Sequence, residues 1–339
     1  MTPSELSRTV VRVVRSAVDE GALDLAPLRG DLVVKVERPR PGGRGDYASG
    51  IALKLAAAAG LPPRAVAEVL RTRMAGQPGI ALVEISGPGF LNITLDRAAQ
   101  DDVVRQVRDA GLRYGYGDAL RGQRFEFAGP GEERAAVVVE VVVRLLEAQG
   151  ALARVVQEGG AELPVVACAA PRPAGPQGPP PAPLAVLVGV DAARWALLRA
   201  ARHDRPRTDV EELLAQRESN SLFRVRYAHS RSRALTRNAA ELGFASEPGA
   251  VSEGGPLLAL LGDHPAVLEG AARHHAPDRL ARHLEAVADE LLRFQHAVLP
   301  RGDEKPSAAH RSRLALAEAA GTVLAGGLSL LGIDAPEFL

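Results

Sequence analysis

The stretch that decides the fold is Asn220–Arg233, which reads Asn-Ser-Leu-Phe-Arg-Val-Arg-Tyr-Ala-His-Ser-Arg-Ser-Arg. The apolar side chains of this stretch can face a core while several arginines project from the other side of a helix. Between Ser219 and Ala240 there is no acidic residue, and the arginines are Arg224, Arg226, Arg231, Arg233 and Arg237. A basic strip with an embedded tyrosine suits a phosphate backbone with a stackable base. The alternative is a solvated helix face without a ligand.

The residue pattern of this helix gives a second reason to consider RNA binding. The pattern Asn220-x-x-Phe223-x-Val225-x-Tyr227-Ala-His-x-Arg231 resembles the Asn-Pro-x-Tyr-x-Val-x-Tyr-Ala-His-x-Arg signature of arginyl-tRNA synthetases. That signature lies in the helical C-terminal anticodon-binding domain of the family. This chain differs from it by a serine where the family has proline and by an arginine where it has glutamine. The resemblance implies tRNA-binding residues in this helix, namely Arg224, Arg226, Tyr227, His229, Arg231, Arg233 and Arg237.

The residues around this helix extend the resemblance. Gly189-x-Asp-Ala-x-Arg194-Trp195 resembles the segment that joins the catalytic core of the family to its helical domain, and Trp195 is expected in a core. The chain ends in a sequence, Gly327–Leu339, that resembles the family's C-terminus near the anticodon loop. Apolar residues spaced by three and four after Pro277 predict a further amphipathic helix. We therefore expect an all-α bundle over residues 184–339, the DALR-type anticodon-binding domain of class I synthetases.

The N-terminal region predicts a small α+β domain over residues 1–112. Thr2-Pro-x-Glu5 has the pattern of a capping box, and the apolar residues that follow are spaced for one helix face. Short strands are expected over Leu32–Val36, Ile80–Ile85 and Phe90–Leu95. Further helices are expected from Asp46 to Gly60 and after Pro62-Pro63.

Two motifs of this region carry a second resemblance. Gly45–Ser49 and Gly87–Asn92 resemble the Gly-Asp-Tyr-Ala-[Ser/Thr]-Asn and Gly-Pro-Gly-Phe-[Ile/Leu]-Asn motifs of the synthetases' N-terminal additional domain. In the family this domain contacts the tRNA around its D-loop, which implies tRNA contacts here by Arg44, Asp46, Tyr47 and Asn92. Two simpler explanations compete with this one. The glycines can merely set turns, and Asp46 can be a helix N-cap.

Residues 120–170 resemble only a remnant of the family's catalytic α/β domain. Phe125–Pro130 resembles its opening strand and turn, and Val137–Gly150 resembles the helix that follows. The family's His-x-Gly-His sequence, which holds the ATP phosphates, is replaced by Gly131-Glu-Glu-Arg134. The first histidine is His203, and no lysine lies between Lys54 and Lys305. These absences predict no catalytic residues, and no cofactor, although the family uses ATP.

The remaining features concern the linker, the cellular location and the histidines. Residues 171–183 hold seven prolines and two glycines, which predicts an extended linker. The 339 residues carry no net charge. The sequence has a single cysteine, Cys168, and predicts neither a signal peptide nor a membrane span, so we expect a cytoplasmic location. Five histidines match no common metal spacing, so we expect exposed histidines and no metal site. They are His264, His274, His275, His283 and His296.

Together these observations predict a truncated paralogue of arginyl-tRNA synthetases, a pseudoenzyme that binds tRNA without catalysis. It would hold the anticodon arm and the elbow of a tRNA, such as an arginine tRNA, and could serve a partner enzyme. Two alternatives stay open. One is an arginine-tRNA ligase that uses ATP, and the other is a protein-interaction module that has lost RNA binding.

Overall fold

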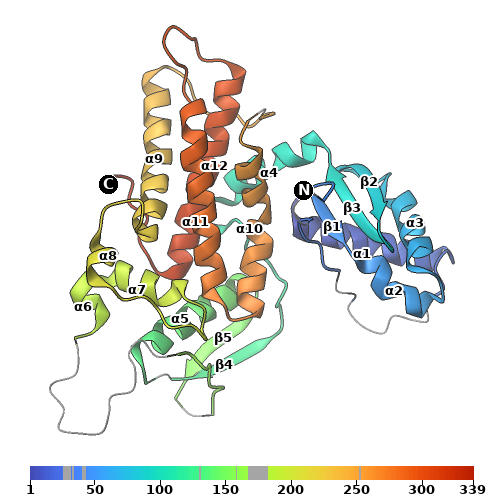
Figure 1. Cartoon of the computed structure of the whole chain (residues 1–339), viewed down its shortest axis with the longest axis horizontal. Helices are drawn as coiled ribbons and strands as arrows, with labels where there is room; N and C mark the ends of the chain where they lie inside the picture. The colour runs from blue at the N-terminus through green and yellow to red at the C-terminus, as the bar shows by residue number, and fades with distance from the viewer. Residues whose placement is uncertain are drawn as a thin grey trace. The chain divides into compact units, whose positions relative to one another are not determined.

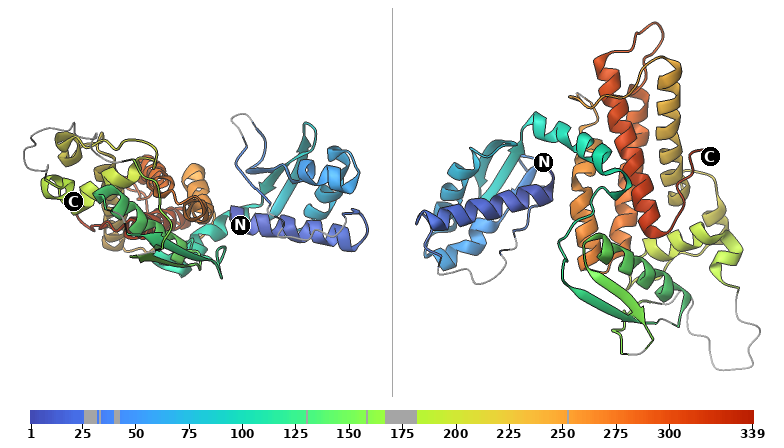
Figure 2. Two further views of the ribbon diagram at one scale, coloured as in Figure 1. Left: turned by 90° about the horizontal axis from the view of Figure 1, so that it is seen from below. Right: turned by 180° about the vertical axis from the view of Figure 1, so that it is seen from behind.

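The structure is a computed structural model of the whole chain, and it describes residues 1–25, 32, 34–39, 43–129, 131–157, 159–166, 182–251 and 253–339. Contacts divide the chain into two compact units, Met1–Val103 and Val104–Leu339 (Figures 1 and 2). Each unit is described by itself. The expected linker over residues 171–183 and Cys168 fall almost entirely outside the described residues. The domain limits that we inferred from the sequence therefore stay predictions.

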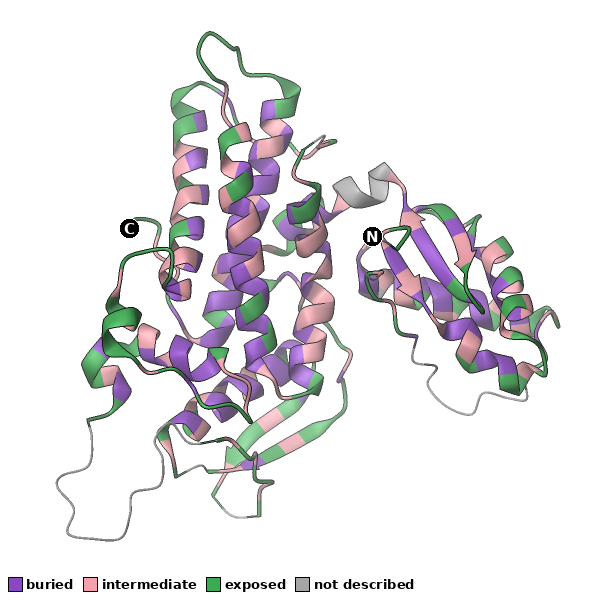
Figure 3. Cartoon of the chain, in the orientation of Figure 1, coloured by how far each residue is buried: buried purple, intermediate pink, exposed green. Residues whose placement is uncertain are grey.

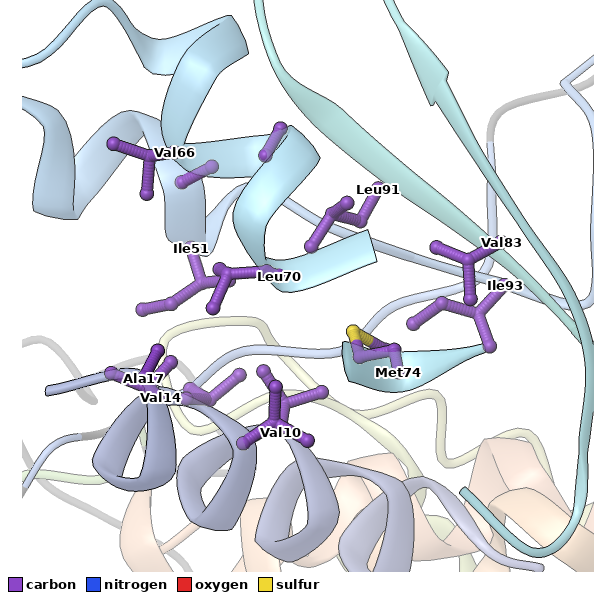
Figure 4. Close-up of a cluster of buried hydrophobic side chains, with 14 of the residues drawn as sticks. Val10, Val14, Ala17, Ile51, Val66, Leu70, Met74, Val83, Leu91 and Ile93 are labelled. Atoms are coloured by element: carbon purple, nitrogen blue, oxygen red, sulfur yellow. The ribbon is translucent and has the colours of Figure 1, made fainter. Parts of the chain in front are cut away.

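The first unit packs three helices against an antiparallel sheet. Its elements are α1 (Pro3–Asp19), β1 (Tyr47–Ser49), α2 (Ile51–Ala59), α3 (Pro63–Met74), β2 (Ile80–Ser86), β3 (Phe90–Leu95) and the start of α4 (Arg97–Ala110). The strand order is β1-β3-β2, and Tyr47 pairs with Ile93 in the register of the sheet. Apolar side chains from all three helices meet Leu91 and Ile93 of β3 in one buried cluster (Figure 4). This cluster is the core that fixes the sheet.

The N-terminal predictions are confirmed in part. The hydroxyl of Thr2 and the carboxylate of Glu5 form the reciprocal capping box at the start of α1. The helix expected from Asp46 is wrong in its first turn, because residues 47–49 form β1 and the helix begins at Ile51. Among the described residues of 32–36, none belongs to a strand. Pairing with β3 wins over local helix propensity at Tyr47, since strand residues gain cross-strand contacts there.

The second unit is a helical bundle attached to a small parallel sheet. Its elements are the end of α4, η1 (Gly111–Arg113), β4 (Arg124–Ala128), α5 (Glu133–Ala148), β5 (Leu152–Val156), α6 (Leu184–Val188), α7 (Val190–Arg199), α8 (Val210–Leu214), α9 (Ser221–Glu241), α10 (Gly255–Arg273), α11 (Pro277–Phe294), η2 (Gln295–Ala297) and α12 (Ala308–Leu331). The expected α+β and all-α character is confirmed. The apolar run at 184–190, whose composition alone fits a strand as well as a helix, forms α6 and the start of α7.

Helices α9, α11 and α12 form the centre of the bundle (Figure 1). Gly321 of α12 faces Ser232 of α9 so closely that a Cβ atom there would lie 2.4 Å from the serine oxygen. The same hydroxyl donates to the carbonyl of Ala317 over 2.8 Å. By length and composition α12 could cross a membrane, contrary to the expectation from the sequence, but most of it is buried among the other helices. It therefore serves as the core helix of this unit.

Candidate nucleic-acid interface

Helix α9 is held by its cap and by one buried face. Asn220 accepts the N–H groups of Leu222 and Phe223 with its side-chain oxygen, and its amide donates to the carbonyls of Leu213, in α8, and of Ala215. The indole N–H of Trp195, a buried core residue as expected, donates to Ser221 over 2.9 Å. These bonds fix the first turn of α9, and the position of every arginine on the helix follows from it.

The C-terminal segment, residues 333–339, lies along α9 and contacts three of its arginines. Arg226 donates to the carbonyl of Asp334 over 3.0 Å and pairs with Asp191 of α7. Arg233 pairs with Glu337 at 3.0 Å, and the guanidinium of Arg237 lies 4.3 Å from the ring centre of Phe338. These arginines therefore have partners within the chain, whereas the sequence suggested that they project from the helix.

His229 is also part of this contact. It is buried, and its Nδ1 lies 2.9 Å from the carbonyl oxygen of Pro336, so that nitrogen carries the proton and donates. Burial lowers the pKa of His229 below its ordinary value, and the nearby Arg233 acts in the same direction. The imidazole is therefore neutral at pH 7 and anchors the C-terminal segment rather than contacting a phosphate.

The other two arginines face α11 and η2. Arg224 forms an ion pair with Asp289 at 2.7 Å and donates to the carbonyl of Glu218, and Arg231 donates to Gln295 over 2.6 Å. Between them Tyr227 is 42% exposed, and its ring stacks on Phe223 with the ring centres 6.0 Å apart. The accessible part of this surface is thus an aromatic pair bordered by arginines. Such a pair can stack a nucleobase.

The acidic residues around α9 predict a competition with RNA. Glu337 holds Arg233, so replacing it by glutamine should strengthen binding of tRNA about twofold to fivefold at low salt, because an exposed ion pair is worth up to about 1 kcal/mol. The measurement is a titration of labelled tRNA with wild type and Glu337→Gln. A matched control is Glu126→Gln, which removes an equally exposed partner of Arg154 in the same unit. Equal affinities of wild type and Glu337→Gln would show that Glu337 does not oppose RNA.

The first unit has a cavity of about 580 Å³, which is a second candidate site. It is lined by Lys35, Glu37, Arg38, Pro39, Gly43, Ala48, Gly50, Ile51, Lys54, Ser86, Phe90 and Asn92. Phe90 is 42% exposed, and Asn92 donates its amide to Ser86 over 2.7 Å. Two of the three lysines of the chain, Lys35 and Lys54, line this cavity with Arg38. Lys35 is paired with the carboxylate of Glu37, which also lines the cavity. The cavity therefore combines an aromatic side chain, an amide and three cations, one of them already paired, and such groups hold a base and its phosphate.

Three of the residues predicted in this unit lie outside the lining of the cavity. Tyr47 is 4% exposed, with Arg38 over its ring at 5.2 Å, so it belongs to the core. Asp46 accepts the backbone N–H of Leu95 over 2.8 Å and so ties the motif to β3. Arg44 is exposed and pairs with Glu84. Sequence reasoning missed Phe90, Lys35 and Lys54, although the aromatic after Gly89 gave a signal.

Two glycines of these motifs have a structural reason. Gly45 has φ +79°, and a Cβ atom there would lie 2.9 Å from the carbonyl oxygen of Ile93. Gly89 has φ +149°, and its Cβ atom would lie 2.9 Å from the backbone of Pro63. Only glycine adopts such a positive φ readily and also leaves room for the neighbouring backbone at these two positions. The turn explanation therefore holds for these two residues, beside any role that the motifs have in binding.

The N-terminus of α5 is the place where the resemblance puts the ATP phosphates. Here the carboxylate of Glu132 caps the helix by accepting the N–H of Ala135 over 3.0 Å. Arg134 is fully buried and donates to five backbone carbonyls, those of Val166, Leu197, Ala200, Ala201 and Asp204. A carboxylate at this position repels a phosphate, and the arginine points to protein oxygens. These residues do not fit a triphosphate at this helix.

The expectation that the histidines are exposed is wrong for two of them. His264 and His283 are buried side by side on α10 and α11, with ring centres 5.2 Å apart. Burial lowers the pKa of both rings, that of His283 to about 4. Among the described residues no group of three or more histidine, cysteine, aspartate or glutamate side chains could hold a metal ion.

Comparison with family models matches both ends of the chain. Residues 225–339 match the DALR anticodon binding domain, and residues 10–95 match the arginyl tRNA synthetase N terminal domain. The chain therefore carries the anticodon-binding domain type that the motif on α9 indicated.

Three similar proteins are named arginine–tRNA ligase, and they align with this chain in two ways. The protein of Frankia alni is 28% identical over 553 aligned positions, which cover 99% of this chain and 100% of that protein. The protein of Paenarthrobacter aurescens is 27% identical with the same coverage. The protein of Renibacterium salmoninarum is 44% identical over 161 residues, and this chain spans only 29% of its length.

These relatives correct two expectations from the sequence. The prediction of a non-catalytic protein is contradicted, because proteins that match this chain from end to end are named for the ligation of arginine to tRNA. That prediction rested on the missing histidine and lysine motifs. The description as a truncated pseudoenzyme likewise finds no support in matches that cover the whole of the relatives.

Solved structures agree with this assignment at the level of the fold. The arginyl-tRNA synthetase of Thermus thermophilus superposes with a TM-score of 0.69 at 13% identity and full coverage of both chains. That of Plasmodium falciparum superposes with a TM-score of 0.65 at 8% identity and 99% coverage of both. With both terminal domains matched and relatives aligned along its whole length, this chain belongs to the arginyl-tRNA synthetase family.

Proposed function

We propose that this protein takes part in the ligation of arginine to tRNA, the reaction for which its end-to-end relatives are named. The contribution that follows from its geometry is the binding of tRNA. The surface of α9 would hold the anticodon arm, and the cavity beside Phe90 would hold the elbow. The single observation that carries this proposal is the Tyr227–Phe223 stack bordered by Arg224 and Arg231.

The energetics of such binding divide between charge and stacking. Phosphate contacts supply most of the affinity and make it depend on salt, while a base on an aromatic ring adds about 1–3 kcal/mol. Since Arg224 and Arg233 of α9 have carboxylate partners, RNA phosphates must replace those carboxylates. We therefore expect moderate, salt-sensitive affinity, with selectivity carried by Tyr227.

Replacement of Tyr227 by alanine tests the stacking. We expect affinity for an arginine tRNA to fall by about 5-fold to 150-fold, which corresponds to the loss of about 1–3 kcal/mol. The measurement is a binding titration with an arginine tRNA and an unrelated tRNA across a salt series. Tyr116→Ala is the matched control, because Tyr116 is a similarly exposed tyrosine, at 37%, outside α9. Unchanged affinity in Tyr227→Ala would remove the stack from the interface.

The ligation itself is tested by incorporation of labelled arginine into tRNA in the presence of ATP, together with ATP–pyrophosphate exchange. Arginine incorporation that depends on this protein supports the proposal. If arginine is incorporated but tRNA does not bind through α9, the tRNA site lies on another surface of the protein. If the protein neither binds an arginine tRNA nor supports incorporation, the proposal is wrong.

A further inference from the structure

The parallel sheet of the second unit is incomplete. Strands β4 and β5 pair in parallel from Arg124–Leu152 to Ala128–Val156, with α5 as their connection. Parallel strands are normally covered on both faces, and sheets usually have about four to six strands. In the part of the chain that the structure describes, the sheet has the order β4-β5, so no strand pairs with the outer edge of β5. An unpaired edge exposes backbone groups that can pair with another chain.

The open edge of β5 is also apolar. Leu152 is 62% exposed and Val155 is 48% exposed, and Figure 3 shows most of β5 as exposed or intermediate. Natural edge strands are commonly protected by charges or proline, but β5 reads Leu-Ala-Arg-Val-Val. Its single charge, that of Arg154, is paired with Glu126. The strand therefore lacks the features that prevent an edge strand from pairing with another chain.

An apolar groove of about 400 Å³ runs between α5 and β5. It is lined by Ala136, Val139, Glu140, Val143, Arg144 and Val155. The residues from α5 are spaced by three and four, so they form one stripe on that helix. Their apolar members are small, which allows another helix to approach closely.

We propose that β5 pairs antiparallel with β5 of a second copy of this chain, about a twofold axis at Arg154. The two sheets then join into one of four strands, and Val155 lies opposite the partner's Ala153. Each α5 contacts its own β5, so the two α5 helices lie on the same face of the joined sheet.

The surface complements itself in charge as well as in shape. Glu140 and Arg144 border the groove one helical turn apart, and both side chains are about 40% exposed. In a twofold arrangement the two α5 helices run antiparallel, so each Glu140 can lie beside the partner's Arg144. A second copy thus buries the apolar stripe, pairs both open edges and repeats the same ion pair across the axis. These features favour a second copy over an unrelated strand.

Analytical ultracentrifugation of the full chain from about 1 to 100 μM tests the proposal, because dimer content depends on protomer concentration. We expect wild type to sediment as a dimer at the upper concentrations, and Val155→Glu to weaken dimerisation at least tenfold. The matched control is Leu82→Glu, a similarly exposed apolar residue, at 51%, on β2 of the first unit, which should stay dimeric. Circular dichroism at 222 nm verifies that each variant is folded.

A crosslink tests the register independently. Arg154→Cys in a Cys168→Ser background should form an intermolecular disulfide on oxidation, since opposed residues of antiparallel strands lie about 4.5–5.5 Å apart, within disulfide range. The same change at Lys305, an exposed position outside the sheet, should not crosslink. A wild-type protein that is monomeric throughout the concentration range would overturn the proposal. So would a dimer that survives Val155→Glu and does not crosslink at position 154.

Discussion

Replacing Arg134 by methionine should lower the free energy of unfolding of the second unit by about 3–5 kcal/mol, the largest effect that we expect from a single substitution. Arg134 is fully buried, and its five hydrogen bonds end on the carbonyls of Val166, Leu197, Ala200, Ala201 and Asp204. Leu197 and Ala200 lie at the C-terminal end of α7, where a cation also stabilises the helix dipole. Methionine fills similar space but leaves these oxygens buried without their donor.

Chemical denaturation followed by helical circular dichroism measures this loss. Arg121→Met is the matched control, because Arg121 lies in the same unit, its side chain is 78% exposed and it pairs with the exposed Asp118. The control should lose less than about 1 kcal/mol. If Arg134→Met is as stable as this control, the buried guanidinium does not hold the connection between α7 and α8.

Acidification should destabilise the second unit through the buried histidine pair. Burial lowers the pKa of His283 from 6.5 to about 4, and it lowers the pKa of His264 well below the ordinary value, with help from His283. Below pH 6.5 the unfolded chain binds protons at these rings that the folded chain does not. The stability therefore falls as the pH decreases from about 6.5 to 4, by about 3 kcal/mol for His283 alone.

The pH dependence of unfolding checks this prediction. In the double variant His264→Phe/His283→Leu the free energy of unfolding should change much less between pH 6.5 and pH 5, where carboxylates titrate little. His203→Ala is the control, because the side chain of His203 is 84% exposed and should leave the slope as in wild type. A slope unchanged in the double variant would assign the acid sensitivity to other groups.

Local patterns predicted most of the elements, and long-range contacts explain what they missed. The capping box of α1, the end of α2 at Gly60 and the start of α11 at Pro277 follow from short spacings, and all three are confirmed. The apolar run 184–188 could be either helix or strand by composition alone. Its helical form depends on packing against α7, which no local rule encodes.

The helix that carries the candidate arginines was predictable from the sequence, but the partners that these arginines have in the folded chain were not. The sequence placed the arginines on one helix correctly. Their partners Asp191, Asp289 and Glu337, however, lie 35 to 104 positions away in the chain. No spacing rule reveals such pairs. His283 did carry a signal, because it lies three residues after Leu280 and four before Val287 on the buried face of α11. Phe90 and the two lysines gather only when the sheet folds.

The contact between α9 and residues 333–338 sets the order of events during biosynthesis. The end of α9 at Glu241 is made roughly 100 residues before Glu337, an interval on the order of 5–20 s at about 5–20 residues per second. During that time His229, Ser230 and Arg233 lack the groups that they bind in the folded protein. Helix α12, the core of the bundle, is made in the same interval. The first unit can thus fold while the ribosome is still translating, whereas the second must wait for residues 308–338.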